Sequence, residues 1–196
     1  MATAFGVATS GVLMFSALSA QNVDPFYPAV YGSVTDPDAA AEKVDYCLAH
    51  PQIQGVFHYH SASICLADSS YQNRGPVIDA DIKGLMQSVW EAVPYRSAFG
   101  VSKDGRPVLT PYHGNKQAYG DCEVDVCNGV TINGHYHYAT TFFHPYIMGC
   151  YGMGSAPELY QQCSMNPRLC NVVMGGVTAT VSMAVASASA LFMTLY

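Results

Sequence analysis

The spacing of apolar residues predicts two helices. The stretch 35–51, TDPDAAAEKVDYCLAHP, has an Asp-Pro start, apolar residues four apart and a proline at its end. A second stretch, about 80–93, has apolar side chains at helical spacing and is followed by Pro94. Its apolar stripe, which is typical of a helix packed on a core, consists of Ile82, Leu85, Met86, Val89, Trp90 and Val93.

Other stretches have the period of two that is typical of strands. GVFHYHSAS at 55–63 and GHYHYATTF at 134–142 each place two histidines on either side of a tyrosine. As strands, they would have both histidines on one face and the tyrosine on the other. Asp104-Gly105 lies between two short apolar runs and predicts a hairpin, whose second strand Pro107 places at an edge or near a bulge.

Both ends of the chain lack charged side chains. Residues 1–20 contain an apolar run of signal-peptide length and finish with small residues suited to cleavage; the alternative is a buried N-terminal element. Residues 172–196 are long enough to cross a bilayer as a helix. Two alternatives for this tail are a signal removed on attachment of a glycolipid anchor and a segment that pairs as a strand. We interpret 1–20 as a signal peptide, 21–171 as the folded domain and 172–196 as a hydrophobic tail that attaches the chain to a surface.

Seven cysteines lie between these two ends. In an exported chain they predict a disulfide framework, with one thiol left free or paired between molecules. Zinc binding by cysteine is the weaker alternative, because Cys122 and Cys127 have no second close pair to complete a site. The connectivity stays open, although a Cys47–Cys65 bond would bracket the first histidine segment. The expected fold is α+β and mainly antiparallel β, a single domain stabilised by disulfides with about two helices packed on the sheet.

Composition and charge narrow the function. The chain has 196 residues, half of them hydrophobic, which is enough for one domain with a real core. A net charge of −6 with eight Lys plus Arg argues against a nucleic-acid partner. No Gly-x-Ser-x-Gly nucleophile turn is present, and cysteine nucleophiles do not suit an oxidised chain, so we do not expect an enzyme.

Four motifs in order carry a resemblance to a known family. GVFHYHSASICL, SKDGRPVLTPY, DVCNG and GHYHYATTFFHPYIMGCYG resemble the signature of the YHYH-domain family of secreted or surface proteins. The likeness covers roughly 47–152. Phe57 and Gly134 stand where the name-giving first tyrosine would be, so both copies keep two histidines and the central tyrosine. The resemblance implies export and a β-rich fold, and it supplies no settled activity.

The doubled His-x-His pattern predicts a metal site. Two such histidines lie about 7 Å apart at Cα on one strand face, so both can reach one ion. If the two segments are neighbouring strands with aligned faces, four imidazoles converge, a set that suits copper(II), zinc or nickel. The alternative is a ladder of tyrosines and histidines that needs no metal. The predicted ligands are His58, His60, His135 and His137, with His113 and His144 as supplementary groups.

Two functions follow from these patterns. The first is an exported, disulfide-stabilised cell-surface domain that binds copper or zinc through the two His-x-His strands. The alternative is a structural or adhesive extracellular protein that associates with itself or with a matrix, in which the Tyr/His segments serve as a packing ladder. His50, beside Pro51, is assigned only a favourable interaction with a helix end.

Overall fold

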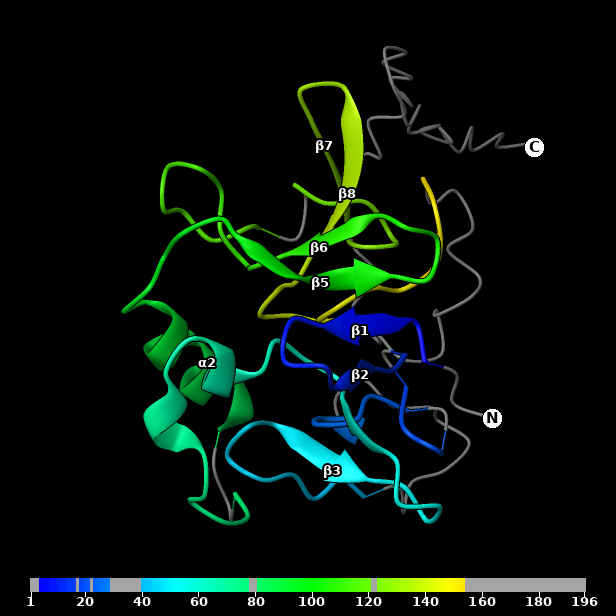
Figure 1. The fold of residues 1–196 in the computed structure, drawn as a ribbon, viewed down its shortest axis with the longest axis vertical. Helices are drawn as coiled ribbons and strands as arrows, with labels where there is room; N and C mark the ends of the chain where they lie inside the picture. Colours follow the sequence, from blue (N-terminus) through cyan, green and yellow to red (C-terminus); the bar gives the residue numbers. More distant parts are fainter. Residues whose placement is uncertain are drawn as a thin grey trace, which may run out of the picture.

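Eight strands form one mixed sheet. The structure, a computed structural model, describes residues 4–16, 18–21, 23–28, 40–77, 81–120 and 123–153. The strand order is β3-β4-β2-β1-β5-β6-β8-β7. The strands follow one another along the long axis of the molecule, from β3 at one end to the β7–β8 hairpin at the other (Figure 1). Two pairings, β2 with β4 and β6 with β8, are parallel and the other five are antiparallel, which confirms the mainly antiparallel prediction.

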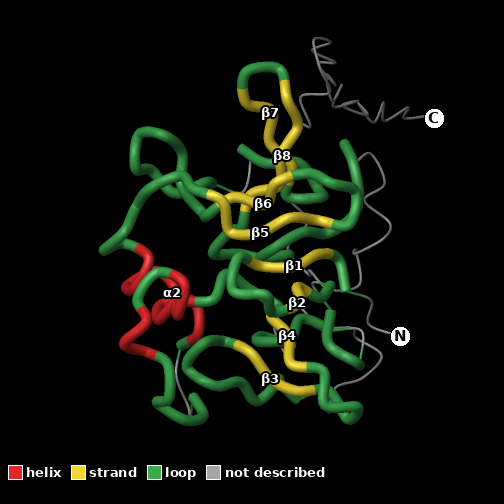
Figure 2. Tube along the Cα trace, in the orientation of Figure 1, coloured by secondary structure: helices red, strands yellow, loops and turns green. Residues whose placement is uncertain are grey.

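The strands are short, and the helical segments lie together beside them (Figure 2). The strand bounds are β1 Gly6–Ala8, β2 Leu13–Met14, β3 Ala49–Pro51, β4 Phe57–Tyr59, β5 Ala98–Ser102, β6 Pro107–Leu109, β7 Gly129–Ile132 and β8 His135–Ala139. The helical segments are the 3₁₀ turns η1 Ile64–Leu66 and η2 Ser69–Tyr71 and the α-helix α2 Ile82–Trp90.

Helix α2 confirms the second predicted helix. It buries the part of the apolar stripe that faces the main core, namely Ile82, Met86, Val89 and Trp90. Among the described residues it is the one α-helix, so the prediction of about two helices is confirmed only in part.

The first predicted helix is wrong over its described part, 40–51. The carboxylate of Asp45 accepts a hydrogen bond from the Ala49 amide at 3.1 Å, and Leu48 has a φ of 60°. Residues 49–51 then form β3, which pairs with β4. Tertiary pairing and a disulfide from Cys47 therefore override the local helical pattern.

The Asp104-Gly105 hairpin is confirmed, as the turn between β5 and β6. Strand β6 lies between β5 and β8, so the edge position suggested by Pro107 is wrong. The nearby bulge is confirmed, because the register of β5 against β6 shifts between Ala98 and Gly100. Pro107 is the first residue of its strand, where its missing N–H costs least.

The N-terminal segment forms the centre of the sheet. Strands β1 and β2 lie between β4 and β5, so residues 4–16 have the structure expected of a buried N-terminal element. Cleavage of a signal peptide stays a prediction, and cleavage after residue 20 would remove both strands. The predicted tail, 172–196, lies outside the described residues. Within the described part of the chain, no helix has the length and apolar character needed to cross a membrane.

The sheet has internal two-fold pseudosymmetry about the β1–β5 pairing. On one side the hairpin β1–β2 is followed by the hairpin β3–β4, and β4 runs parallel to β2. On the other side the hairpin β5–β6 is followed by β7–β8, and β8 runs parallel to β6. We call these halves the first and second repeat.

The first hairpins of the two repeats match residue by residue. The sequence AFGV occurs at 4–7 and again at 98–101, and the equivalent residues Val7 and Val101 pair with each other. Both hairpin turns contain a glycine with positive φ, 83° at Gly11 and 82° at Gly105. The repeat is therefore present in the sequence as well as in the topology.

The second hairpins match through their disulfides and turns. The bonds Cys47–Cys65 and Cys127–Cys150 each join a residue before the hairpin to one after it. The first of these was named in the sequence analysis as the bond that brackets the histidine segment. Closing loops of 18 and 23 residues stabilises the folded state by about 3 kcal/mol each.

The strand register fixes which residues of the second hairpins are equivalent. In the first repeat Ala49 pairs with Tyr59, and in the second Gly129 pairs with Tyr138. Tyr59 and Tyr138 are therefore equivalent, and His58 is equivalent to His137.

Candidate metal centre

Three histidines meet at the β3 edge of the sheet. His50 comes from β3, His58 from β4, and His60 follows the last residue of β4. His50 and His58 are direct partners in the β3–β4 register. One ring nitrogen from each histidine lies within 4.8 Å of the other two, which is the arrangement of a group that could hold a metal ion. We call His50, His58 and His60 the histidine triad.

Backbone carbonyls orient two of the three rings. His58 Nδ1 lies 3.0 Å from the carbonyl oxygen of Val56, and His60 Nδ1 lies 2.7 Å from that of Ser16. A carbonyl oxygen only accepts hydrogen bonds, so both Nδ1 atoms carry the proton and donate it. Each Nε2 therefore carries a lone pair.

Those two lone pairs face each other. The Nε2 atoms of His58 and His60 are 3.1 Å apart. Two acceptors at this distance repel unless a positive species, either a proton or a metal ion, lies beside both. The Nε2 of His50 is buried and has no hydrogen-bond partner among the described residues. Glu42 Oε2 lies 3.7 Å from His50 Nδ1.

Burial favours the neutral form of these imidazoles. His58 and His60 are 1% and 2% exposed, and the ring of Phe15 stacks on His58 with centroids 4.0 Å apart. Desolvation lowers the pKa of His60 to about 3, and it also lowers the pKa of His50 and of His58. A shared proton is thereby disfavoured near pH 7, which leaves a metal ion as the better partner for the two lone pairs.

The second repeat lacks an equivalent of this group. His137 occupies the position of His58, but Val130 stands in place of His50 and Ala139 in place of His60. Val130 and Ala139 belong to a small apolar cluster with Tyr119, Val124 and Phe143. The positions that hold imidazole rings in the first repeat are therefore occupied mainly by apolar side chains in the second.

The structure separates the two predicted histidine pairs. Strands β4 and β8 have four strands between them, β2, β1, β5 and β6, so the expected convergence of His58 and His60 with His135 and His137 is wrong. The prediction that each motif is a strand is confirmed. The physical reason for the separation is the repeat, because each His-rich strand belongs to its own half of the sheet.

The two supplementary residues also lie away from the triad. His113 Nε2 is 3.2 Å from Glu123 Oε2, and the His113 ring packs on Tyr119 in the second repeat. His144 is buried and its ring makes an edge contact with Tyr146. Neither is part of the three-histidine group.

Sequence reasoning missed His50. The incorrect helix at 35–51 placed it at a helix end, where the helix dipole was explanation enough. One signal would have found it: aligning the two hairpins on Asp-x-Cys at 45–47 and 125–127 places His50 two residues into a strand. In an antiparallel hairpin that position lies opposite a residue of the Phe-His-Tyr-His strand.

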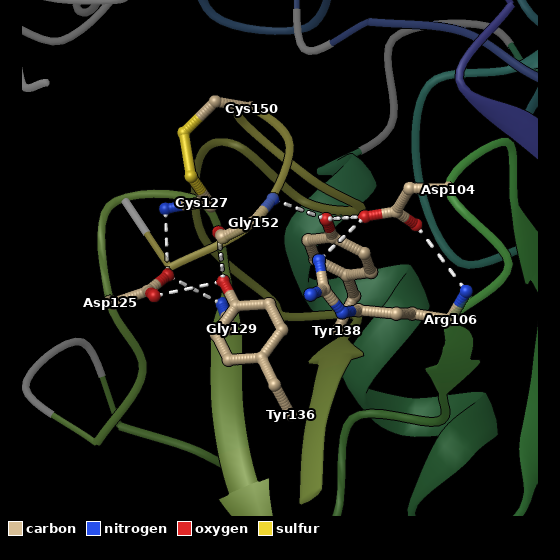
Figure 3. The surroundings of a disulfide bond; sticks show 9 residues. All are labelled: Asp104, Arg106, Asp125, Cys127, Gly129, Tyr136, Tyr138, Cys150 and Gly152. Carbon is tan, nitrogen blue, oxygen red and sulfur yellow. Dashed lines mark hydrogen bonds and ion pairs between the residues drawn. A yellow bond between two sulfur atoms is a disulfide. The ribbon is translucent and has the colours of Figure 1, made fainter. Parts of the chain in front are cut away.

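The tyrosines of the second motif have a structural role. Tyr138 donates a hydrogen bond to Asp104 Oδ2 at 2.6 Å and accepts one from the Gly152 amide at 2.7 Å (Figure 3). The hydroxyl oxygen of Tyr136 lies 2.9 Å from Asp125 Oδ2 and also within hydrogen-bond distance of the Gly152 carbonyl, and its single proton goes to one of these two acceptors. Both groups hold the segment that follows Cys150 against the hairpin. These contacts give the two tyrosines a packing role and involve neither His135 nor His137.

Comparison of the chain with protein-family models, with curated proteins and with solved structures finds no match in any of the three. The assignment of a function therefore depends on the triad itself.

Buried His60 makes the metal-free protein sensitive to acid. Its pKa is about 3 in the folded state and about 6.5 in an unfolded chain, so the unfolded state binds more protons between these values. We expect the free energy of unfolding to fall by up to about 1.4 kcal/mol per pH unit below pH 6.5 from this residue. Denaturant unfolding of metal-free protein between pH 7 and 4.5 measures the slope, which His60→Gln should reduce.

Asp24 acts in the opposite direction. It is fully buried, and desolvation raises its pKa to about 6, so the folded state takes up this proton first and gains stability as the pH falls from 6. The comparison of His60→Gln with its parent is therefore best repeated in an Asp24→Asn background. An identical slope with and without His60 would contradict the prediction.

Proposed function

We propose that the chain is a metal-binding domain that holds one divalent transition metal ion, zinc or copper, between His50, His58 and His60. The observation that carries the proposal is the pair of Nε2 lone pairs 3.1 Å apart, each fixed by a carbonyl on the other side of its ring. Metal-binding histidines commonly donate their second ring N–H to a carbonyl or carboxylate, which fixes the tautomer.

The His58–His60 distance supports a shared ion, and the His50 nitrogen, within 4.8 Å of both, would have to move closer to bind it. Ligand nitrogens about 2.0–2.1 Å from zinc are about 3.3 Å apart in a tetrahedral site, close to the 3.1 Å between His58 and His60. Imidazole suits zinc, copper and nickel, whereas magnesium and calcium prefer oxygen. Three protein nitrogens leave a fourth position for water or a further ligand.

The two disulfides among the described residues favour an oxidising compartment, such as the outside of the cell. They support export as a part of the proposal, whereas membership of the YHYH-domain family is proposed from the ordered motifs of the sequence alone. Attachment to a membrane through 172–196 is proposed from composition alone.

Metal analysis and calorimetric titration of the purified protein test the proposal. We expect about one ion per chain after dialysis, and at least a 100-fold loss of affinity in His60→Ala and in His50→Ala, because losing a ligand costs more than losing an orienting partner. His113→Ala, outside the triad, is the matched control and should bind as the parent does. His50 is partly exposed, so its variant has the smaller effect on folding.

The outcome that would overturn the proposal is a metal content and a metal affinity that His50→Ala and His60→Ala leave unchanged. A proton shared by the triad would then account for the geometry, and the structural or adhesive function would be the better explanation of the whole chain.

A further inference from the structure

His135 and His137 lie on one face of a hairpin at the end of the sheet. They pair with Ile132 and Val130 of β7, and the tip of the β7–β8 hairpin projects beyond the neighbouring strand β6 (Figure 1). His135 is exposed and His137 is half-buried. Residues 129–139 include no charged side chain, so no lysine or arginine of the hairpin repels a cation.

His137 keeps the orientation of its equivalent in the triad. His58 Nδ1 donates to the carbonyl two residues before it, that of Val56, at 3.0 Å. His137 Nδ1 donates to the carbonyl of His135 at 2.9 Å, again two residues before. The lone pair of His137 is therefore on Nε2, as it is in His58, even though Val130 and Ala139 replace the other two triad ligands.

The opposite face of the hairpin is held firmly. Tyr136 and Tyr138 alternate with the two histidines and make the hydrogen bonds to Asp125, Asp104 and Gly152 that Figure 3 draws. Gly129 has no side chain because the Tyr136 ring lies over it: a Cβ there would overlap the phenol. The guanidinium of Arg106 also lies on this face, 5.0 Å from the centre of the Tyr136 ring. The two histidines lie on the face opposite this cation, with His135 exposed and His137 half-buried.

We propose that His135 and His137 form a second, solvent-facing site for a divalent transition metal ion of the nickel(II) or copper(II) type. Side chains two residues apart on a strand, about 7 Å apart at Cα, reach one ion from the same side. Two imidazoles supply the protein ligands and water fills the remaining positions. This site is weaker and more rapidly exchanging than the triad, because it has one ligand fewer and is open to water. It stands independently of the metal proposed for the triad.

Retention of the untagged, folded protein on a nickel-charged column is the first test, since only exposed imidazoles reach an immobilised ion. The parent should be retained, because once one imidazole binds the immobilised ion the second is held near it at a high effective concentration. The double variant His135→Ala/His137→Ala lacks both imidazoles and should elute at about one tenth of the imidazole concentration that elutes the parent. His113→Ala is the control and should elute with the parent. Equal retention of the parent and the double variant, or no retention of the parent, would overturn the proposal.

Copper(II) titration separates this site from the triad. In a His50→Ala background, which disables the triad, one weaker equivalent of copper should remain and should disappear when His135 and His137 are both replaced. Far-UV circular dichroism and thermal unfolding confirm that the compared variants are folded. A copper stoichiometry unchanged by the double replacement would contradict the site even where column retention has fallen.

Discussion

A chain that lacks residues 1–20 should not fold. Strand β1 pairs with β5 and β2 pairs with β4, so in the described sheet these two strands alone connect the β3–β4 hairpin to the second repeat. The deletion also removes Met14, which is fully buried in the core, and the Ser16 carbonyl that orients His60. A domain of this size is stable by only about 5–15 kcal/mol, so we expect the loss of two central strands to leave no stable fold. We expect no cooperative thermal transition by circular dichroism and no tight metal binding.

A chain that lacks 172–196 is the comparison for this result, because the described sheet includes none of those residues. It should keep the cooperative transition of the full chain. Cooperative unfolding of the chain that starts at residue 21 would contradict the central position of β1 and β2 and would favour the signal-peptide interpretation. N-terminal sequencing of protein recovered from a secreting host would show directly whether residues 1–20 are removed.

The Gly100→Ala variant should lose about 3 kcal/mol of stability, toward the upper end of the range for overpacked sites. A Cβ on Gly100 would lie 2.5 Å from the carbonyl oxygen of Val7 and 2.9 Å from the Cα of Ala8. Both are backbone atoms of β1, so rotation of a side chain cannot relieve the overlap. Strand β1 would have to move away from β5. Denaturant unfolding measures the change.

Gly114→Ala is the matched control for Gly100→Ala. Its Cβ would meet only the guanidinium of Arg96, at 3.6 Å or more, which is ordinary van der Waals contact. Replacing glycine where the backbone allows it stabilises a protein by about 0.4–1 kcal/mol through the unfolded state. A Gly100 variant as stable as the Gly114 variant would show that β1 does not pair closely with β5.

Local patterns predicted the elements whose signals agree with their tertiary setting. The apolar stripe of α2 and the Asp-Gly turn between β5 and β6 are of this kind, and both were confirmed. The helix expected over 35–51 failed because the side chain of Asp45 binds the backbone of Ala49 and β3 pairs with a strand that comes later in the chain. Such competition depends on long-range contacts and is invisible to helical periodicity.

The histidines show the same limit. Both His-x-His segments were recognised as strands. The distance between them depends on the order of strands in the sheet, and in this sheet four other strands lie between them. The sequence pattern aligned His58-Tyr59-His60 with His135-Tyr136-His137, so that His58 matched His135. The strand register shows that His58 is instead equivalent to His137. The recurrence of AFGV at 4–7 and 98–101 was the available signal for the repeat, and it would have placed residues 4–7 in the fold.

The pairing of Val7 with Val101 gives this chain the geometry of a two-fold dimer whose protomers have been fused. In a true homodimer every substitution appears twice, so a site built in one protomer is necessarily built in the other. Fusion removes that constraint. Position 60 is histidine while its counterpart at 139 is alanine, and position 50 is histidine while its counterpart at 130 is valine. A symmetric homodimer would carry either two triads or none. This single chain combines one histidine triad in the first repeat with the small apolar cluster in the second.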